Sequence, residues 1–505
     1  MSQQHESVWM ATSEGSDHQP LDGPLEVDVA IVGAGITGLT TALLLQRQGR
    51  RVAVMEMARI GTGTTGHTTG KLTSLHGLTY VDLVKKHGRE KARLYGEANQ
   101  AAIDQVGRLA GELGVDCRFR RASAFTYTAS PKHRSMIEEE VATAVELGLP
   151  AALVEGAAVP FPVEAAVRFD NQAHLHPRRY CLGLARRIVA DGGHLFEQTR
   201  ALDVDERLDH AVVRTQRGDV TAAQVVLATL LPFVDLGGFF AKARPTRSYG
   251  LALRLRHAAP EGMWLSVESP TRSTRPWPDG GPEGLIVVGE SHPTGHDEDT
   301  KRYYDDLEQW ARSTFDVEAV EHRWSAQDYM TADSVPYVGR SPRMAHTLVA
   351  TGFKKWGLSN GTAAAMILAD LVAGRDNPWL AVFDATRIGD AQTVKKLVEE
   401  NLHVGKRFVE DRLTRLRAPE AAHLRPGQGG IVEADGATVG AYRDREGDLH
   451  AVSLTCRHMG CSLRWNSAET SWDCPCHGSR YSYTGRLLNG PAVEDLPVIQ
   501  VDQRQ

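Results

Sequence analysis

Four residues near the C-terminal end of the chain have the types and spacing of metal ligands. Cys456 and His458 form a C-x-H pair, and Cys474 and His477 form a C-x-x-H pair fifteen residues further on. Two thiolates on one iron and two imidazoles on the other are the ligands of a Rieske [2Fe–2S] centre. The alternative, a Cys/His zinc site, usually has two like pairs separated by a loop. The interleaved order therefore favours a one-electron carrier.

One further cysteine accompanies each ligand pair, Cys461 on the first loop and Cys476 on the second. These two could join the loops as a disulfide. The region resembles the Rieske proteins of the cytochrome bc1 and b6f type over about the final eighty residues. The resemblance implies that Ser479 and Tyr481, in G-S-x-Y, donate hydrogen bonds to cluster sulfurs. Because such bonds raise the reduction potential, we expect it in the upper half of the roughly −150 to +300 mV range.

The composition narrows the class of protein. A chain of 505 residues exceeds one ordinary core, so two or three domains are expected. Its net charge of −6, with both signs spread along the chain, gives no basic surface for nucleic acid. No run of about eighteen apolar residues and no charged-then-apolar leader is found, so we expect a soluble, cytoplasmic protein without a membrane span. Cys117 and Cys181 belong to no motif and are expected in the core.

A second set of residues with chemical meaning lies near the front of the chain. From Val27 the sequence VDVAIVGAGITGLTTALLLQRQGRRVAVMEM indicates a strand, a glycine turn, an amphipathic helix and a second strand. Gly33, Gly35 and Gly38 form G-x-G-x-x-G at the turn, and Glu56 ends the second strand. In this context the glycines admit a pyrophosphate to the helix N-terminus, and the acid accepts hydrogen bonds from a ribose. The alternative is a turn whose glycines are only structural.

Later segments distinguish between nucleotides. ARIGTGTTGHTTGKLTS after Glu56, NQAHLHPRR near Pro177, VVLAT at 225–229 and ATGFKKWGLSNGTAAAMILADLV at 350–372 resemble, in this order, the motifs of the D-amino-acid-oxidase and glycine-oxidase superfamily. The resemblance implies FAD as the cofactor, with the N-terminus of the last helix pointing at the isoalloxazine ring. The FAD-binding residues that it implies are Gly33, Ala34, Gly35, Ile36, Thr37, Gly38, Glu56, Met57, Thr64, Thr65, His67, Thr68, Thr69, Thr229, Gly352, Gly357, Leu358 and Ser359.

The two resemblances imply a fold class and a division of the chain. The fold class is an α/β Rossmann-like FAD-binding domain with an interleaved antiparallel-sheet α+β substrate domain, followed by a small all-β Rieske domain. Residues 1–23 lack periodicity and are expected to form a flexible tail. The other predicted parts are 24–385 for the oxidoreductase (FAD-binding segments about 24–80, 190–235 and 336–385; substrate domain about 90–190 and 240–335), 386–422 for a bracing helix or linker, and 423–505 for the Rieske domain.

Four residues are candidates for contact with the flavin or the substrate. In dimethylglycine and sarcosine dehydrogenases a histidine in G-T-T-W-H is bonded covalently to the flavin, and His67 ends GTTGH, which lacks the tryptophan. The alternative is a histidine that is only hydrogen-bonded near the cofactor. Arg247 and Tyr249 could line the substrate side or be ordinary strand residues, and Lys355 could activate oxygen or bind a carboxylate. No catalytic base is named, because a desolvated amine can lose its proton without one.

The leading hypothesis is a dehydrogenase for an amine or amino acid, which oxidises a C–N bond by hydride transfer to FAD. Electrons would leave one at a time through the Rieske cluster to an unidentified acceptor, which is a protein, a quinone or oxygen. One alternative is an FAD oxidase that makes hydrogen peroxide; apolar residues at 286–288, where family oxidases often hold a lysine, oppose it. Another is a non-catalytic redox-sensing protein. A Rieske-type oxygenase is disfavoured, since no His/His/carboxylate iron site is recognised.

Overall fold

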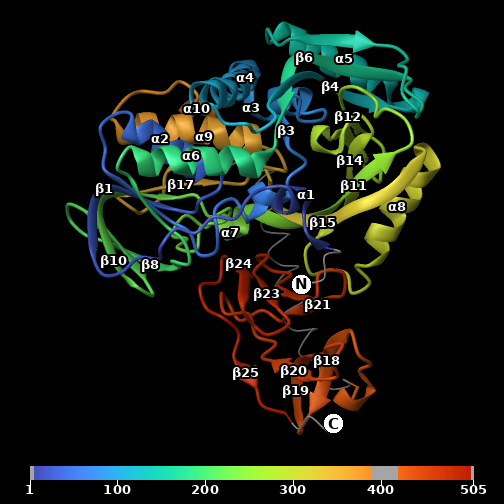
Figure 1. Cartoon of the computed structure of the whole chain (residues 1–505). Coiled ribbons are helices and arrows are strands. Elements are labelled where there is room, and N and C mark those ends of the chain that lie inside the picture. Colours follow the sequence, from blue (N-terminus) through green and yellow to red (C-terminus); the bar gives the residue numbers. More distant parts are fainter. Residues whose placement is uncertain (1–4, 388–418, 502–505) are drawn as a thin grey trace.

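The computed structural model describes residues 5–387, which we call the N-terminal domain, and 419–501, the C-terminal domain (Figure 1). The apolar segment after Pro24 forms β1 (Leu25–Val32), and the glycine turn leads into α2 (Ile36–Gln46) and β2 (Val52–Met55). These strands belong to an eight-stranded sheet with the order β16-β17-β10-β1-β2-β7, and β8 and β9 extend it beside β10. The other strands are β7 (His194–Phe196), β8 (Ala201–Glu206), β9 (Ala211–Thr215), β10 (Gly218–Leu227), β16 (Tyr337–Arg340) and β17 (Thr347–Thr351).

Five strands of this sheet, β7, β2, β1, β10 and β17, run parallel. Parallel strands need cover on both faces, which explains their nearly continuous apolar sequences. Helices α2, α6 and α9 pack together on one face, and α4 lies against α9 (Figure 1). A Cβ at Gly361 of α9 would lie 2.5 Å from Thr37 Oγ1 of α2, so a glycine permits this close approach. The helices here are α3 (Tyr80–His87), α4 (Arg89–Glu112), α6 (Pro177–Ala190), α9 (Gly357–Val372) and α10 (Leu380–Phe383).

A second, nine-stranded sheet is interleaved with the first along the chain. Its order is β15-β11-β14-β13-β12-β4-β6-β3, with β5 paired to β6, and its pairs are antiparallel except for β12 with β4. α8 packs against β14 and β11, and α5 against β5 and β6. The elements are β3 (Lys71–Leu72), β4 (Arg120–Thr128), α5 (Arg134–Glu146), β5 (Ala151–Val154), β6 (Ala165–His174), α7 (Phe239–Lys242), β11 (Ala243–Leu255), β12 (Met263–Ser266), β13 (Ser273–Pro276), β14 (Gly284–Pro293), α8 (Arg302–Thr314) and β15 (Val317–Thr331).

The C-terminal domain consists of two four-stranded antiparallel sheets, in the orders β18-β19-β20-β25 and β21-β22-β23-β24. The predicted fold class is thereby confirmed. The helix expected within 386–422 lies almost wholly outside the described residues. The strands are β18 (Gln428–Ala434), β19 (Ala437–Arg443), β20 (Leu449–Val452), β21 (Arg464–Asn466), β22 (Ser471–Asp473), β23 (Arg480–Ser482), β24 (Leu487–Asn489) and β25 (Val498–Ile499).

The segment before β1 differs from the flexible tail that its uneven sequence suggests. Residues 8–11 form a short helix, α1 (Val8–Ala11), and Trp9 is only 1% exposed. Trp9 Nε1 donates to Thr68 O at 2.6 Å, and the Arg275 guanidinium lies 5.0 Å from a Trp9 ring centroid. One buried tryptophan with these two contacts is enough to hold a short polar segment in place, and composition alone does not reveal it.

Candidate functional site

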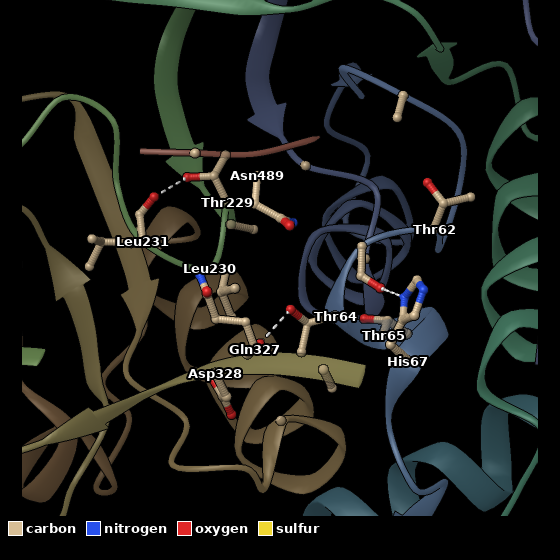
Figure 2. A pocket seen from close by; sticks show the side chains of 18 of the residues that line it. Thr62, Thr64, Thr65, His67, Thr229, Leu230, Leu231, Gln327, Asp328 and Asn489 are labelled. Atoms are coloured by element: carbon tan, nitrogen blue, oxygen red, sulfur yellow. Dashed lines mark hydrogen bonds between the residues drawn. The ribbon is translucent and has the colours of Figure 1, made fainter. Parts of the chain in front are cut away.

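A pocket lies where the carboxyl ends of β1, β2 and β10 face the second sheet and the C-terminal domain (Figure 2). In open α/β sheets, ligands bind at this end of the parallel strands. Of the residues that the sequence assigns to FAD, all except Gly38, Gly352 and Ser359 line this pocket. The structure therefore brings together segments from both ends of the N-terminal domain.

The glycine turn after β1 is shaped for a close approach of backbone and ligand. Gly33 has a φ of +106°, and a Cβ there would lie 2.6 Å from Ala228 O. At Gly38 a Cβ would lie 1.9 Å from Gly33 O, so this glycine packs beneath the turn and does not reach the pocket. Gly35 is the N-cap of α2 and offers no capping side chain. The first N–H groups of α2 therefore fit an anion such as a pyrophosphate.

Glu56 is held at the end of β2 beside this turn. Its two carboxylate oxygens accept N–H groups of Ala34 and Ala58, each at 2.9 Å. Burial raises the pKa of Glu56, and these two hydrogen bonds oppose the rise. A carboxylate oxygen can accept more than one hydrogen bond. Glu56 can therefore also accept hydrogen bonds from ribose hydroxyls, as the sequence predicts.

His67 lies at the pocket at the end of a single 3-10 turn, Thr64–His67. Its Nδ1 is 2.9 Å from Gly63 O (Figure 2). Since a carbonyl only accepts, Nδ1 carries the proton and Nε2 of the neutral ring is bare. Burial lowers the pKa of His67, which favours this neutral form. An unprotonated nitrogen at a flavin pocket is compatible with either reading of His67.

The turn before α9 brings two lysines near the pocket. A Cβ at Gly352, where φ is +77°, would lie 2.3 Å from Thr331 Cγ2, so the turn requires a glycine there. Lys354 and Lys355 also have positive φ angles, 53° and 70°. Such left-handed backbone is costly for residues with a side chain and is found often at functional sites. Ser359, one turn into α9, faces away from the pocket and lies 3.0 Å from His76 Nε2.

Asp328 of β15 and Lys355 are the two ionisable neighbours at this turn. One Asp328 oxygen accepts the Lys355 main-chain N–H at 2.5 Å, and the other accepts the N–H of Tyr329 at 2.7 Å. Burial raises the pKa of Asp328 to about 6 and lowers the pKa of Lys355 to about 8. Lys355 is exposed at the edge of the pocket, and its Nζ donates to Ser291 Oγ. Both groups therefore titrate near neutral pH, which is typical of functional sites.

The other two pocket candidates lie on the far face of β11. Arg247 is fully buried, and its guanidinium points to the C-terminal domain, 3.6 Å from Glu469 and 3.9 Å from Asp473. The Tyr249 ring stacks against His292 and Tyr303, although the residue borders the pocket. Because strand side chains alternate, β11 turns its even-numbered residues to the pocket instead. These are Thr246, Ser248 and Gly250.

One wall of the pocket comes from the C-terminal domain, and sequence reasoning missed it. Residues 487–493 line the same pocket as the glycine turn, and Asn489 projects beside Thr229 (Figure 2). Arg200 fixes this segment from the N-terminal domain, because it pairs with Asp495 at 3.0 Å and donates to Val493 O at 3.3 Å. No spacing within 487–493 signals a contact with residues more than 400 positions earlier.

The four predicted cluster ligands lie on two facing loops. The first ligand loop (residues 453–463) joins β20 to β21, and the second (residues 474–479) joins β22 to β23. Cys456 and Cys474 are buried free cysteines, and the rings of His458 and His477 have centroids 5.0 Å apart. Nδ1 of each histidine is buried without a hydrogen-bond partner among the described residues. Two thiols and two unsatisfied ring nitrogens fit the mixed ligand set of a Rieske cluster.

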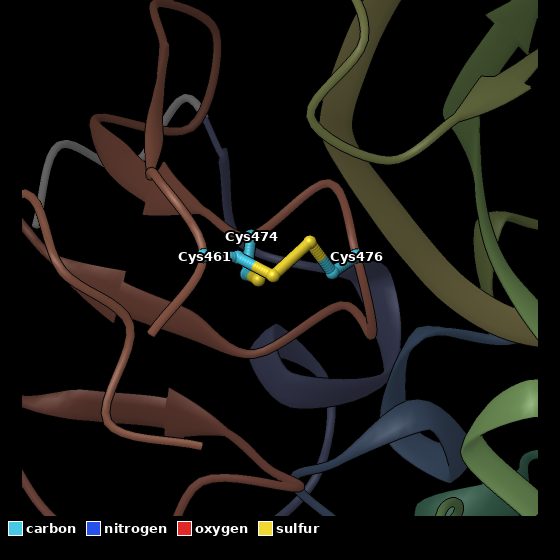
Figure 3. A group of neighbouring side chains, drawn as sticks. All are labelled: Cys461, Cys474 and Cys476. Carbon is cyan, nitrogen blue, oxygen red and sulfur yellow. A yellow bond between two sulfur atoms is a disulfide. The ribbon is translucent and has the colours of Figure 1, made fainter. Parts of the chain in front are cut away.

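A disulfide between Cys461 and Cys476 joins the two ligand loops. Cys474 Sγ lies within 4.8 Å of both bonded sulfurs (Figure 3). The disulfide sulfurs carry no thiolate, so only Cys474 of this group is available to a metal. The cross-link therefore holds the loops that present the ligands and is no ligand itself.

Side chains around the loops occupy the places that the resemblance implies. Tyr481 Oη lies 3.5 Å from Cys456 Sγ and accepts the N–H of Arg457 at 3.1 Å. Ser479 is fully buried, and its Oγ accepts the N–H of Ala492 at 3.0 Å. The donor role of the two hydroxyls toward cluster sulfur stays a prediction.

The N-terminal domain covers one histidine more than the other. Phe240 has its ring centroid 5.1 Å from that of His477 and 6.5 Å from that of His458. His477 is only 6% exposed, whereas His458 is half-buried. The second ligand loop is thus the one that faces the flavin pocket side of the molecule.

Comparison with known proteins gives matches for both domains. A family model described as FAD dependent oxidoreductase matches residues 28–371, and one described as Rieske [2Fe-2S] domain matches 415–500. The chain is similar to the Rieske 2Fe-2S iron-sulfur protein YhfW of Bacillus subtilis, with 36% identity over 499 residues that cover 98% of each protein. It is also similar to gamma-glutamylputrescine oxidoreductase of Escherichia coli, with 27% identity over 233 residues, which are 45% of this chain and 54% of that protein.

Among solved structures, glycine oxidase from Geobacillus kaustophilus aligns with a TM-score of 0.61 and 20% identity. The alignment covers 72% of this chain and 99% of that protein, which shows that the fold of the N-terminal domain is shared. Across residues 5–387 and 419–501, no helix combines the length and apolar character needed to cross a bilayer.

Proposed function

Because the chain belongs to the FAD dependent oxidoreductase family and ends in a Rieske domain, we propose that it oxidises an amine or amino acid and releases the electrons singly through the cluster. FAD and a [2Fe–2S] cluster are its cofactors. When bound, FAD supplies two-electron oxidation by hydride acceptance, and the cluster supplies one-electron transfer. We assign FAD binding to the pocket residues that the sequence predicted, and cluster binding to Cys456, His458, Cys474 and His477.

The observation that carries this proposal is the shared pocket wall. Residues 487–493 of the C-terminal domain line the pocket together with Gly33 and Thr229 of the N-terminal domain. Through this wall the cluster-binding domain is in direct contact with the flavin pocket. An arrangement of this kind suits a relay of electrons from flavin to cluster better than two independent redox modules.

The substrate class is supported by the pocket and by the names of relatives. Gamma-glutamylputrescine oxidoreductase and glycine oxidase are named for an amine and an amino acid. Lys355 offers a cation that can hold a substrate carboxylate, and Asp328 positions it by accepting its main-chain N–H. Trp324, Phe353 and Val288 line the same pocket, and such apolar walls would keep water from the reacting carbon. A desolvated amine in such a pocket loses its proton more readily.

The acceptor that we propose takes one electron at a time and is a protein or a quinone. Val288, whose strand was expected to carry a lysine in an oxidase, lines the pocket as an apolar residue. This opposes oxygen as the main acceptor. Lys355 is the other candidate for oxygen activation. Its role in oxygen activation can be distinguished from binding of a carboxylate by comparing Lys355→Met with and without oxygen.

The test is an anaerobic titration of the holoenzyme with primary, secondary and N-methylated amines and amino acids. Flavin bleaching and the low-temperature EPR signal of the reduced cluster are followed together. We expect one compound to bleach the flavin and the EPR signal to grow afterwards. Oxidised flavin with every compound, while dithionite reduces both centres, would contradict the proposal. Stoichiometric hydrogen peroxide in air at the rate of turnover would favour an oxidase.

Covalent attachment through His67 is tested separately with the same protein. The protein is denatured with acid and centrifuged, and the yellow colour is measured in pellet and supernatant. Colour that stays with the pellet in the unmodified protein and is lost in His67→Ala would show the covalent bond. All of the colour in the supernatant would exclude the bond.

A further inference from the structure

Strand β15 sends two side chains into the second ligand loop. Tyr329 Oη donates to His477 O at 2.7 Å, and Gln327 Nε2 donates to Gly478 O at 2.8 Å. Both hydrogen bonds are buried. Because a buried carbonyl without a partner is costly, these bonds determine where the loop rests on the N-terminal domain.

At position 478 of this loop the N-terminal domain approaches so closely that only a glycine fits. Gly478 has a φ of +76°, and a Cβ there would lie 2.6 Å from Pro245 Cβ, 2.7 Å from Gln327 Nε2 and 2.9 Å from Tyr329 Oη. From another side, a Cβ at Gly295 would lie 2.9 Å from Pro475 N. The loop that carries Cys474 and His477 is therefore enclosed by β11, β15 and the end of β14.

Gln327 also touches the flavin pocket. Its main-chain oxygen accepts the Thr64 hydroxyl at 3.0 Å, at the loop that the sequence assigns to the flavin (Figure 2). The Thr294 hydroxyl donates to Gln327 Oε1 at 3.0 Å, which orients the amide so that its N–H groups point to Gly478. A continuous path of covalent and hydrogen bonds thus runs from Thr64 through Gln327 and Gly478 to His477.

We propose that Gln327 and Tyr329 are positioning residues for electron transfer from the flavin to the cluster, an inference that rests on the proposed function. When both cofactors are bound, FAD would supply two electrons taken from the substrate, and the cluster held by Cys456, His458, Cys474 and His477 would pass them one at a time to an external one-electron acceptor. Gln327 and Tyr329 carry no charge in these steps. They hold His477 at a fixed gap from the pocket, and electron tunnelling slows steeply as a gap widens.

The experiment uses the full-length holoenzyme and starts from light. Flavin is photoreduced in the presence of EDTA, so that no substrate is needed, and reduction of the cluster is timed by its absorbance and EPR signal. Gln327→Met removes the amide at nearly constant length, and Tyr329→Phe removes only the hydroxyl. The matched control is Tyr80→Phe, because Tyr80 Oη also donates to a buried carbonyl, Ser74 O, at 2.7 Å but lies away from the ligand loops.

We expect flavin-to-cluster transfer to slow about tenfold or more in Gln327→Met and Tyr329→Phe, as is common for partners of metal ligands, but not in Tyr80→Phe. Dithionite should still reduce the full cluster in each variant, and the midpoint potential of Tyr329→Phe should shift because the His477 loop loses a donor. Transfer within twofold of the unmodified rate in both test variants would overturn the inference, as would equal slowing in the control. Failure of all amines to bleach the flavin would instead contradict the proposed function.

Discussion

In the C-terminal domain all four predicted cluster ligands lie between positions 456 and 477, on two loops joined by a disulfide. The flavin pocket, by contrast, takes its walls from the glycine turn at 33–37, the threonine loop at 62–69, strands β11 and β15, the start of α9 and residues 487–493. One site is thus specified by spacing along a short segment. The other depends on how distant segments fold and on how the two domains dock.

The difference teaches that one site can be lost without loss of the other, although residues 487–493 of the C-terminal domain line the pocket. A change within the ligand loops should remove the cluster and leave the pocket intact. A change at the docking surface should affect both sites.

Cys474→Ser should abolish the cluster, because an alcohol cannot replace a thiolate ligand of iron at neutral pH. The Rieske EPR signal should be absent, while FAD content stays near that of the unmodified protein. Cys117→Ser is the matched control, since Cys117 is also a buried free cysteine, and it should keep the signal. Loss of FAD together with the cluster would show that the pocket depends on the loaded cluster, and would contradict the independence of the two sites.

Arg247→Met should weaken docking of the C-terminal domain. Burial opposes the charge of Arg247, but Asp473 and Glu469 outweigh it and raise its pKa, so the three charges stabilise one another. We expect a loss of about 2–3 kcal/mol, less than the roughly 3–5 kcal/mol of a broken buried pair, because Arg480 still faces both carboxylates. This loss of stability is measured by the temperature at which half of the cluster absorbance disappears, compared with that of the unmodified protein.

The control for this prediction lies on the same strand. Arg254 pairs with Glu321 on the exposed side of β11, and Arg254→Met should cost at most about 1 kcal/mol. Equal effects of the two substitutions would mean that the buried contact with the C-terminal domain adds nothing to stability.

Arg247 also shows what can be read from the sequence and what cannot. The structure places the predicted glycine turn at the pocket and the four predicted ligands on facing loops, since contiguous spacing fixes their local geometry, and their binding roles stay predictions. Cys117 and Cys181 are buried as expected, and burial raises the pKa of Cys117 to about 11 and that of Cys181 to about 12. The face to which Arg247 points was not predictable, because its charged partners, Glu469 and Asp473, lie on the docked C-terminal domain.

The same reason explains the missed residues. Gln327 and Asn489 stand in unremarkable sequence, and their importance arises only from contacts across the domain boundary. Trp9 is a similar case, because it packs with Trp277 and Trp324, more than 250 positions later in the chain. Motifs that a single loop completes are visible in one chain, and contacts between separate elements are not.

Gly33→Ala should lower FAD affinity and spare the cluster. The added Cβ would lie 2.6 Å from Ala228 O at a positive φ, and such overpacking costs about 1–3 kcal/mol. Fluorescence titration of apoprotein with FAD measures the change, expected at about tenfold to a hundredfold. Gly111→Ala is the control, since a Cβ at Gly111 of α4 meets no atom within 4 Å among the described residues and Gly111 does not line the pocket. An unchanged FAD affinity in Gly33→Ala would refute the assigned role of the turn.

The smallest effect, and the one that reaches the substrate, concerns Lys355. Burial lowers its pKa to about 8, so the side chain is cationic below this pH and neutral above it. If it holds a substrate carboxylate, the KM for an amino acid should be constant up to about pH 7 and should rise above pH 8. Lys355→Met should raise the KM at pH 7 about tenfold, as expected for a lost hydrogen bond to a charged group, and remove this rise. Lys355→Arg keeps the charge and should hold the KM low through pH 9.

The same measurement with an amine that has no carboxylate separates two roles of Lys355. Anaerobic flavin bleaching gives the KM and the rate of reduction without oxygen, so any role in oxygen activation cannot contribute. If Lys355→Met changes the KM for the amino acid and not for the amine, the lysine recognises the carboxylate, and the substrate is an amino acid. If neither KM changes but peroxide formation in air falls, the lysine acts on oxygen. The protein would then be an oxidase, and electron transfer through the docked cluster would be a minor route.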